Sequence, residues 1–568
     1  MPYNLIHEKW IPVFDASGVE TGVVTHIAPH EITAGPWVRL AAPRPDFNGA
    51  LAQFLIGLLQ TACTPPTESV WKKWFDTPPG PEELKRYFTQ DIGENNTLDK
   101  AFYLDGDGPR FMQDLEPFKD KKPHKISWLL IDSPGKSTEE KNRDHFIKRD
   151  LVTCMCMSCA ATGLFTLQLN ATEGGRGQLT GMRGGGPLTT LIKGDNLWLT
   201  LWLNVLSKLD FPGLDSAGGK EKAKDIYPWL AQTRTSENEL LTTPADAHPY
   251  QMYWSMPRRI RLAIDSIEDG SCDLCGSQSR LVKGFYDRTY GVRYSPSREQ
   301  AKKGIKIRWQ HCLTPYVITT PQDGIKELSP LHPQPGGVTY RHWLGLVENA
   351  GHKSKTGSSD QEPARVVFNF RDHRKQLASQ LWAFGYDMDS DNPRCWYEAD
   401  MPLVEVGVHL KPAFLESVKN ALEAADYSRN ALRDALKQTW YGKPDVKEVK
   451  GKPQTQWKFP ESVSTDATVF NAIGAAFWQR TEAAFYDFLA DLKTKLEAGE
   501  IREAAHQVWY DTISKEAKRL FDETVESAEL EGDLKSRVFA RKGLVDTLNS
   551  GRLKNDILRF SVIKGVQP

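Results

Sequence analysis

Four of the eight cysteines in this chain form two Cys-x-x-Cys pairs, Cys156 with Cys159 and Cys272 with Cys275. Two thiolates at this spacing can chelate one Zn²⁺, and four thiolates complete a tetrahedral structural site with no open position for catalysis. The gap between the pairs is much longer than the 15–20 residues of a compact zinc ribbon. A redox Cys-x-x-Cys and unrelated thiols therefore stay open as alternatives. We predict one structural zinc ion bound by these four cysteines.

A glycine-rich stretch follows the first cysteine pair and reads EGGRGQLTGMRGGGP from Glu173 to Pro187. Seven of the thirteen residues from Gly174 to Gly186 are glycine. Because glycine loses the most conformational freedom on folding, such a cluster indicates positive φ angles or close approach of the backbone to a ligand. The stretch has neither the Gly-Lys-Ser/Thr ending of a P-loop nor a G-x-G-x-x-G fingerprint. The residues alone therefore predict a glycine loop without naming its ligand.

A basic segment follows the second cysteine pair. Between Arg280 and Arg308 it contains nine Lys or Arg residues and only two acidic residues. Four aromatic residues are interleaved with them, Phe285, Tyr286, Tyr290 and Tyr294. This pattern suits phosphate contacts with occasional base stacking, and it equally suits a solvated strand face. A second basic cluster, His145 to Arg149, precedes the first cysteine pair. A zinc ion held by all four cysteines would bring both basic segments and the glycine loop into one neighbourhood.

A third candidate site lies between Asp387 and Glu398, where Asp387, Asp389, Asp391 and Glu398 match EF-hand positions 1, 3, 5 and 12. Pro393 and Pro402 disfavour the helix that should leave such a loop. A polar loop after a helix ending near Phe384 is therefore the preferred interpretation, with a calcium-regulated scaffold as an alternative. We find no Ser/His/Asp triad, H-E-x-x-H motif or nuclease carboxylate cluster, and we predict no enzymatic activity.

The elements that must position these residues form an α+β architecture in two parts. Residues 1–400 mix short strands and helices: DFNGALAQFLIGLLQTACTPP predicts a helix capped near Asp46 or Asn48, and PLTTLIKGDNLWLTLWLNVL predicts a strand and a buried helix. Residues 401–568 show apolar residues at helical spacing, first around 415–436 and then in segments near 466–498, 500–528 and 533–552. We predict a large mixed domain over 1–400 and a four-helix bundle over 401–568.

Overall composition limits the classes of function. The net charge of −1 means that binding to nucleic acid would depend on local patches. There is no run of eighteen apolar residues, and MPYNLIHEKW has no apolar signal-peptide core. Eight cysteines in 568 residues without a secretion signal favour a reducing cytosol. We therefore expect a cytoplasmic protein.

The order of these landmarks resembles the CasA family, the large subunit of the type I-E CRISPR surveillance complex Cascade. The resemblance rests on NLIHEKWIPV near the start, RFMQ, HFIKR before the first cysteine pair, GMRGGGPLTT, the second cysteine pair, RWQHCLTP, GYDMD and the helical C-terminal part. It spans essentially the whole chain, and the order and spacing of the motifs are more specific than any one of them.

This resemblance implies a non-catalytic subunit that inspects double-stranded DNA for the short protospacer-adjacent motif through the minor groove. Such a subunit promotes duplex opening and R-loop formation and recruits a separate helicase-nuclease, while the CRISPR RNA reads the target by pairing. The implied partners are the other Cascade subunits, CRISPR RNA, target DNA and the helicase-nuclease. A zinc-dependent nucleic-acid enzyme stays as a further alternative, although it would need an open metal site.

The resemblance also assigns roles to individual residues. Gly174, Gly175 and Gly177 correspond to the loop that enters the groove, and Phe146 and Lys148 to the loop that contacts the RNA and adjoining subunits. The family's minor-groove lysine falls near Thr289, so Arg288 or Arg293 would have to replace it. The family's glutamine wedge, which splits the duplex, falls near Asn392.

Overall fold

The structure is a computed structural model in which two compact units are distinguished. It describes residues 2–93, 96–118, 120–142, 149–214, 222–264, 268–294, 309–321, 327–354, 357–373, 380–389, 392–449, 452–460, 468–500, 502–527 and 534–559. Unit 1 comprises Met1–Gln334 and Gly345–Asp400, and unit 2 comprises Pro335–Leu344 and Met401–Pro568. The two units are described separately.

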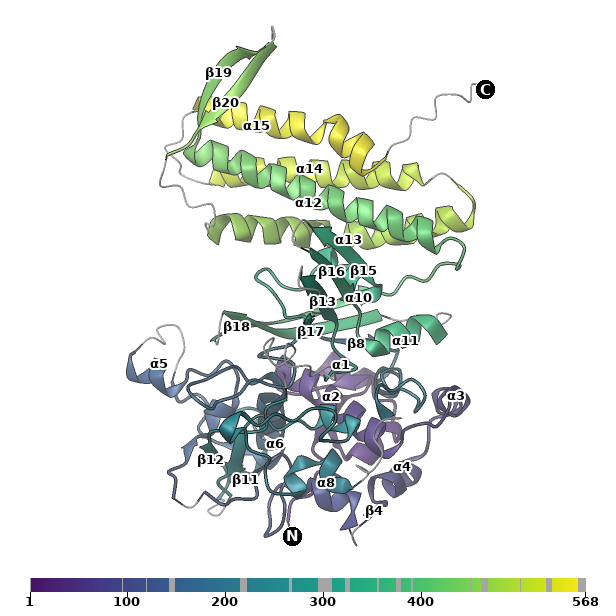
Figure 1. Cartoon of the computed structure of the whole chain (residues 1–568), viewed down its shortest axis with the longest axis vertical. Coiled ribbons are helices and arrows are strands. Elements are labelled where there is room, and N and C mark those ends of the chain that lie inside the picture. The colour runs from purple at the N-terminus through teal and green to yellow at the C-terminus, as the bar shows by residue number, and fades with distance from the viewer. Residues whose placement is uncertain are drawn as a thin grey trace. The chain divides into compact units, whose positions relative to one another are not determined.

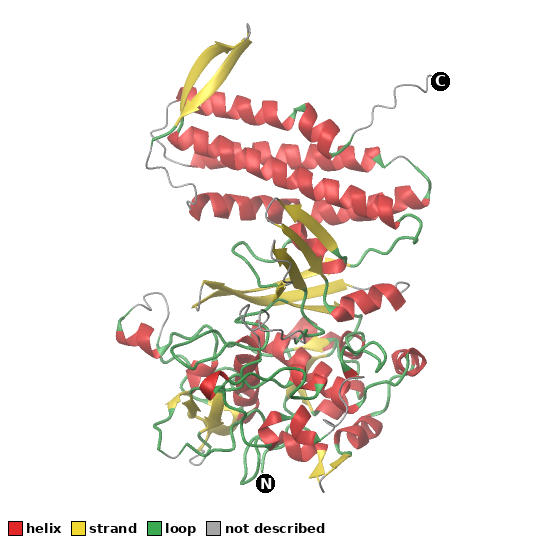
Figure 2. Cartoon of the chain, in the orientation of Figure 1, coloured by secondary structure: helices red, strands yellow, loops and turns green. Residues whose placement is uncertain are grey.

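Unit 1 consists of short helices and strands joined by long loops, as Figure 2 shows by colour. Its helices are α1 (Ala16–Thr21), α2 (Pro45–Ala62), α3 (Glu68–Asp76), α4 (Pro81–Phe88), α5 (Lys136–Glu140), α6 (Met157–Asn170), α7 (Leu197–Trp202), α8 (Ala223–Ile226) and α11 (Arg365–His373). The short helix α10 (Trp343–Val347) begins in unit 2 and ends in unit 1.

Helix α2 lies at the centre of the core of unit 1. It begins with Pro45 at its first turn, a position that tolerates proline because that N–H has no helical partner. Asp46, predicted as a cap, is instead buried, where it pairs with Arg44 at 2.9 Å and accepts a hydrogen bond from Tyr386. Around Phe54 five aromatic rings pack edge-on with centroids 5.2–5.9 Å away, namely Trp10, Phe102, Phe111, Phe165 and Trp254. Such contacts fix α2 against α6.

The strands of unit 1 form several small sheets. Three-stranded sheets have the orders β2-β1-β3, β10-β11-β7, β6-β12-β9 and β18-β17-β8, and a four-stranded sheet has the order β14-β13-β16-β15. The strands are β1 (Ile11–Phe14), β2 (Thr25–Ile27), β3 (Arg39–Leu40), β4 (Asp91–Gly93), β5 (Asn96–Thr97), β6 (His124–Lys125), β7 (Met155–Cys156), β8 (Thr189–Lys193), β9 (Arg259–Leu262), β10 (Glu268–Ser271), β11 (Gln278–Val282), β12 (Gly284–Arg288), β13 (Tyr316–Pro321), β14 (Glu327–Pro330), β15 (Ala350–Ser354), β16 (Gly357–Glu362), β17 (Gln380–Asp389) and β18 (Asn392–Pro402), whose last two residues belong to unit 2. The predicted strand and buried helix after the glycine stretch are confirmed as β8 and α7.

The prediction of a helix ending near Phe384 is wrong, because this segment is strand β17. It pairs antiparallel with β8, placing Leu381 opposite Ile192. A short apolar run is ambiguous between helix and strand, and here the neighbouring strands decide. The EF-hand alternative is contradicted as well, since Asp387 lies on a strand and accepts two hydrogen bonds from Arg394 at 2.7 and 3.0 Å.

Unit 2 is dominated by four long helices that pack against one another (Figure 1). They are α12 (Lys411–Tyr441), α13 (Thr468–Glu497), α14 (Glu503–Ser527) and α15 (Leu534–Leu548), and α12 contacts the other three. A hairpin that the sequence did not predict, β19 (Lys443–Val449) with β20 (Lys452–Lys458), follows α12 and projects from the helices in Figure 1. None of the helices in the described ranges has the length and hydropathy needed to cross a bilayer.

Unit 2 also contains a segment from the middle of the chain, Pro335–Leu344. Tyr340 in this segment is fully buried, and its ring stacks on Phe485 with centroids 4.5 Å apart. Its hydroxyl lies 2.8 Å from the hydroxyl of Thr481. These contacts place the segment in the core of unit 2.

Candidate functional site

The four predicted cysteines come together in unit 1, with all four sulfur atoms within 4.8 Å of one another. Cys156 ends β7 and caps α6, and Cys159 lies in the first turn of that helix. The turn between β10 and β11 carries Cys272 and Cys275. Pairing of Cys156 with Leu281 on β11 brings the two pairs together.

This cluster has the dimensions of a tetrahedral metal site. Four ligands about 2.3 Å from a zinc ion would have sulfur atoms about 3.8 Å apart. The sulfur atoms of Cys156 and Cys275 lie 3.7 Å apart. Hydrogen bonds among the four thiols lower the pKa values of Cys272 and Cys275, which favours the thiolate that metals bind, and raise the pKa values of Cys156 and Cys159. The four cysteines can therefore hold a metal ion, and in the described part of the chain they are the one group of Cys, His, Asp or Glu residues so arranged.

The glycine-rich stretch has two halves with different surroundings. The second half is packed into unit 1, where the N–H groups of Gly181 and Gly186 donate to the carbonyls of Ala171 and Asn170 at 3.0 and 3.2 Å. Within this half Arg183 is buried, and burial lowers its pKa to about 10. Its guanidinium donates to Gln53, Thr189 and Thr314 at 2.7–3.0 Å. The second half of the stretch is therefore part of the packed structure of unit 1.

The first half of the stretch, from Glu173 to Arg176, is exposed. A turn closes it, because the Gly174 N–H donates to the Gln178 carbonyl at 3.1 Å and the Gln178 N–H donates to the Gly175 carbonyl at 2.9 Å. Gly177 has a φ of +80°, and a Cβ there would lie 2.8 Å from the Cβ of Thr289. A Cβ on Gly175 would meet no atom within 4 Å. The backbone at Gly175 is therefore free to approach a ligand.

A cavity of about 580 Å³ brings several predicted residues together. Gly174, Gly175 and Asn392 all line it, and so do Gln178 and Asp287. Asn392 is exposed and begins β18, directly before Pro393. Three segments that are far apart in the sequence thus form one concave surface.

A polar network that the sequence did not predict supports the glycine loop. The side chain of Gln178 donates to Asp287 at 3.0 Å and accepts a hydrogen bond from Arg258. His124 lies 2.8 Å from the other oxygen of Asp287. Although burial alone would raise the pKa of Asp287, these hydrogen bonds from His124 and Gln178 lower it, so the carboxylate stays charged. No motif marks these residues, because they lie on the glycine stretch, directly before strand β9 and on strands β6 and β12, and meet only in the folded chain.

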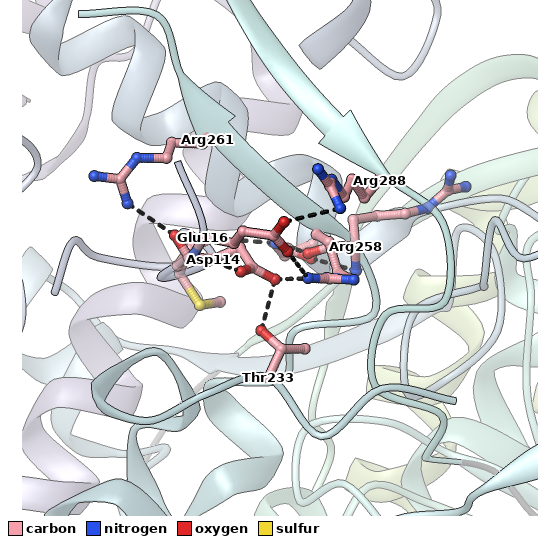
Figure 3. Close-up of polar contacts among 9 residues, drawn as sticks. Asp114, Glu116, Thr233, Arg258, Arg261 and Arg288 are labelled. Atoms are coloured by element: carbon pink, nitrogen blue, oxygen red, sulfur yellow. Dashed lines mark hydrogen bonds and ion pairs between the residues drawn. The ribbon is translucent and has the colours of Figure 1, made fainter. Parts of the chain in front are cut away.

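Arg288, one of the two predicted cations, lies in an ion-pair cluster (Figure 3). Its guanidinium contacts Glu116 at 2.8 Å and Asp120 at 2.6 Å. The neighbouring strand β9 contributes Arg259, which pairs with Glu116 at 2.8 Å and with the buried Asp114 at 2.6 Å. Arg288 is therefore engaged within the protein and does not line the cavity.

The remaining predicted residues lie elsewhere. Arg293 is half-buried after β12, its carbonyl accepts a hydrogen bond from the Thr242 N–H at 2.8 Å, and it does not line the cavity. Phe146 and Lys148 lie outside the described residues. The structure thus places Gly174, Gly175 and Asn392 on one cavity, which neither of the two predicted arginines lines.

Comparison with known proteins identifies relatives of the whole chain. The sequence profile of the CRISPR-associated protein Cse1 matches residues 4–520. The fold is similar to that of Cse1 from Thermobifida fusca, with a TM-score of 0.67 and 16% identity over 98% of each chain. Cse1 from Acidimicrobium ferrooxidans has a TM-score of 0.66 and 16% identity over 98% of this chain and 99% of that one. A chain of a CRISPR RNA-guided surveillance complex has a TM-score of 0.63 and 14% identity over 97% of this chain and 100% of that one.

The solved structures share the fold of this chain at low sequence identity, and the Cse1 sequence profile matches most of the chain. The chain therefore belongs to the Cse1 family of CRISPR-associated proteins.

Proposed function

We propose that this protein is the DNA-inspecting large subunit of an RNA-guided surveillance complex of the Cascade type. In this role it reads the protospacer-adjacent motif through the minor groove, promotes duplex opening and recruits a separate helicase-nuclease. Its partners are CRISPR RNA, the other Cascade subunits and target DNA. Family membership supports this proposal, as does the similarity to a chain of a CRISPR RNA-guided surveillance complex.

The observation that carries the proposal is the shared cavity of Gly174, Gly175 and Asn392. At Gly175 no side chain obstructs the backbone, so its polar atoms can approach a base edge in a groove about 6 Å wide. Asn392 lies on the same surface ahead of the rigid Pro393, where it can enter the base stack. Inserting a side chain between base pairs costs a few kcal/mol, which contacts along a bent or opened duplex offset.

Further parts of the proposal follow from the rest of the chain. The four-cysteine cluster holds a structural zinc ion that ties α6 to the β10–β11 hairpin, and it leaves no open position for a zinc-dependent enzyme. The four helices of unit 2 form a bundle that contacts partner proteins or the DNA backbone without reading bases. Phe146 and Lys148 contact the RNA and adjoining subunits.

The test compares duplex and pre-opened targets bound by the assembled complex at one salt concentration. Gly175→Leu should weaken duplex binding at least about tenfold, or about 1.4 kcal/mol, because the side chain blocks approach to the groove. Asn392→Ala should slow duplex opening. Binding to a target whose strands are already separated should change little for both variants.

Gly80→Leu is a matched control, because Gly80 is also exposed, has an extended backbone (φ −70°, ψ 161°), and would place a Cβ where no atom lies within 4 Å. It lies outside the cavity and should bind both targets normally. Equal losses on duplex and pre-opened DNA for Gly175→Leu would show that the loop only holds DNA, and the motif-reading function would be wrong.

A further inference from the structure

The tip of the glycine loop is held in a defined position. The turn from Gly174 to Gln178 closes through two backbone hydrogen bonds, and the Gly177 carbonyl accepts the Tyr290 N–H at 2.7 Å. The Gln178 side chain fixes the base of the turn to Asp287. A side chain at the tip therefore projects from an anchored backbone, which lowers the entropic cost of ordering it on a ligand.

Among the described residues, three arginines on the segments around this loop and its cavity already have partners inside the protein. Arg258 donates to Gln178 and to the Thr172 carbonyl. The ion-pair cluster around Glu116 holds Arg259 and Arg288 (Figure 3). Moving Arg259 onto DNA would remove its ion pair with the buried Asp114, and unpaired buried groups are costly. Moving Arg258 would break its hydrogen bonds to Gln178 and Thr172. Moving Arg288 would break its ion pairs with the partly exposed Glu116 and the exposed Asp120.

Arg176 differs from these residues. It lies between Gly175 and Gly177 at the tip of the turn and is exposed. Its side chain forms no hydrogen bond or ion pair with any residue that the structure describes. This includes the exposed Glu173, which lies three residues earlier. Its charge is therefore available beside the cavity that Gly175 lines.

We infer that Arg176 is the cation that enters the minor groove and sets the preference among motif sequences, in the place that sequence reasoning gave to Arg288 or Arg293. This inference rests on the proposed function. The narrow minor groove has an enhanced negative potential that attracts arginine. A guanidinium is less strongly hydrated than an ammonium and enters such a groove more readily. The flanking Gly175 and Gly177 carry no side chains, so the anchored backbone on either side of Arg176 can come close to the groove.

The experiment measures binding of the assembled complex to a panel of duplexes that differ only in the motif, at several salt concentrations. Arg176→Gln should weaken binding to the best motif about tenfold. It should also reduce the slope of log affinity against log salt concentration by about one. Because a groove contact senses base sequence, the affinity ratio between good and poor motifs should also shrink. Arg288→Gln should leave this ratio unchanged.

Arg86→Gln is the matched control for charge, because Arg86 is exposed on α4, which contributes no residue to the cavity. Its binding should match that of the unmodified complex. A loss of affinity that is uniform across all motifs would show that Arg176 contacts the phosphate backbone, and it would overturn the inference. Binding that Arg176→Gln leaves unchanged would overturn the inference as well. If Gly175→Leu impairs duplex binding and Arg176→Gln does not, the inference fails while the proposed function stands.

Discussion

The replacement Cys272→Ser tests whether the four-cysteine cluster holds a metal ion that stabilises unit 1. Between Cys159 and Cys272 the chain forms a loop that a bound ion would close. Closing a loop of roughly 110 residues restricts the unfolded chain by about 4.7 kcal/mol, by analogy with a disulfide. Losing this restraint should destabilise unit 1 by a similar amount.

The size of unit 1 converts this free energy into a temperature. With roughly 390 residues, its unfolding entropy is about 0.8 kcal/mol per kelvin, so its Tm should fall by about 6 °C. A strong chelator should lower the Tm of the unmodified protein similarly, and it should have little further effect on Cys272→Ser. Metal analysis of the purified protein should give about one zinc per chain, as a site with four thiolates requires.

Cys63→Ser controls for the loss of a buried thiol, because Cys63 is buried and lies outside the cluster. Its response to the chelator should equal that of the unmodified protein. Purified protein without metal, combined with a Tm that the chelator does not change, would refute the structural-metal reasoning. A full complement of metal in Cys272→Ser with an unchanged Tm would refute it as well.

Two further predictions concern unit 2. Tyr340→Ala should destabilise it by about 3–5 kcal/mol, because the fully buried ring leaves a cavity against α13, and helical circular dichroism during urea unfolding measures this loss. An unchanged midpoint would contradict the packing of Pro335–Leu344 in unit 2. Burial and the charge of Arg341 lower the pKa of His342 to about 3. Because the unfolded chain takes up the proton near pH 6.5, the stability from neutral His342 is complete above that pH and is lost as the pH falls from 6.5 towards 3. Between pH 7 and 5.5 unfolding should become easier by about 1.3 kcal/mol, and His342→Gln should show a smaller fall. An equal fall in both proteins would contradict this assignment.

Patterns set by short-range spacing could be predicted from the sequence. The periodic segments of the C-terminal part predicted helices close to α12–α15, because one apolar face per helix is enough to specify them. Each cysteine pair marked a possible chelating turn, and the glycine cluster marked an unusual loop. The order of these motifs along the chain also carried the family resemblance, which the profile match confirms.

Where the local pattern of apolar residues was ambiguous, contacts with segments distant in the sequence determined the secondary structure and the packing. The segment at Phe384 has an apolar run that suits helix or strand, and pairing with β8 made it a strand. Likewise, Pro335–Leu344 joined unit 2 because the helices there bury Tyr340, which no local spacing reveals.

In the candidate site, too, the residue types could be predicted from the sequence, whereas their interactions could not. The family resemblance made Arg288 a candidate cation, but Glu116 and Asp120 lie about 170 residues earlier and neutralise it only after folding. Gln178 and Asp287 support the glycine loop through a hydrogen bond that joins two distant segments. The sequence therefore determined which chemical groups this protein has and which of them are neighbours along the chain. Only the tertiary structure decided which charges are paired and which, like that of Arg176, stay available, because pairing depends on distances in space.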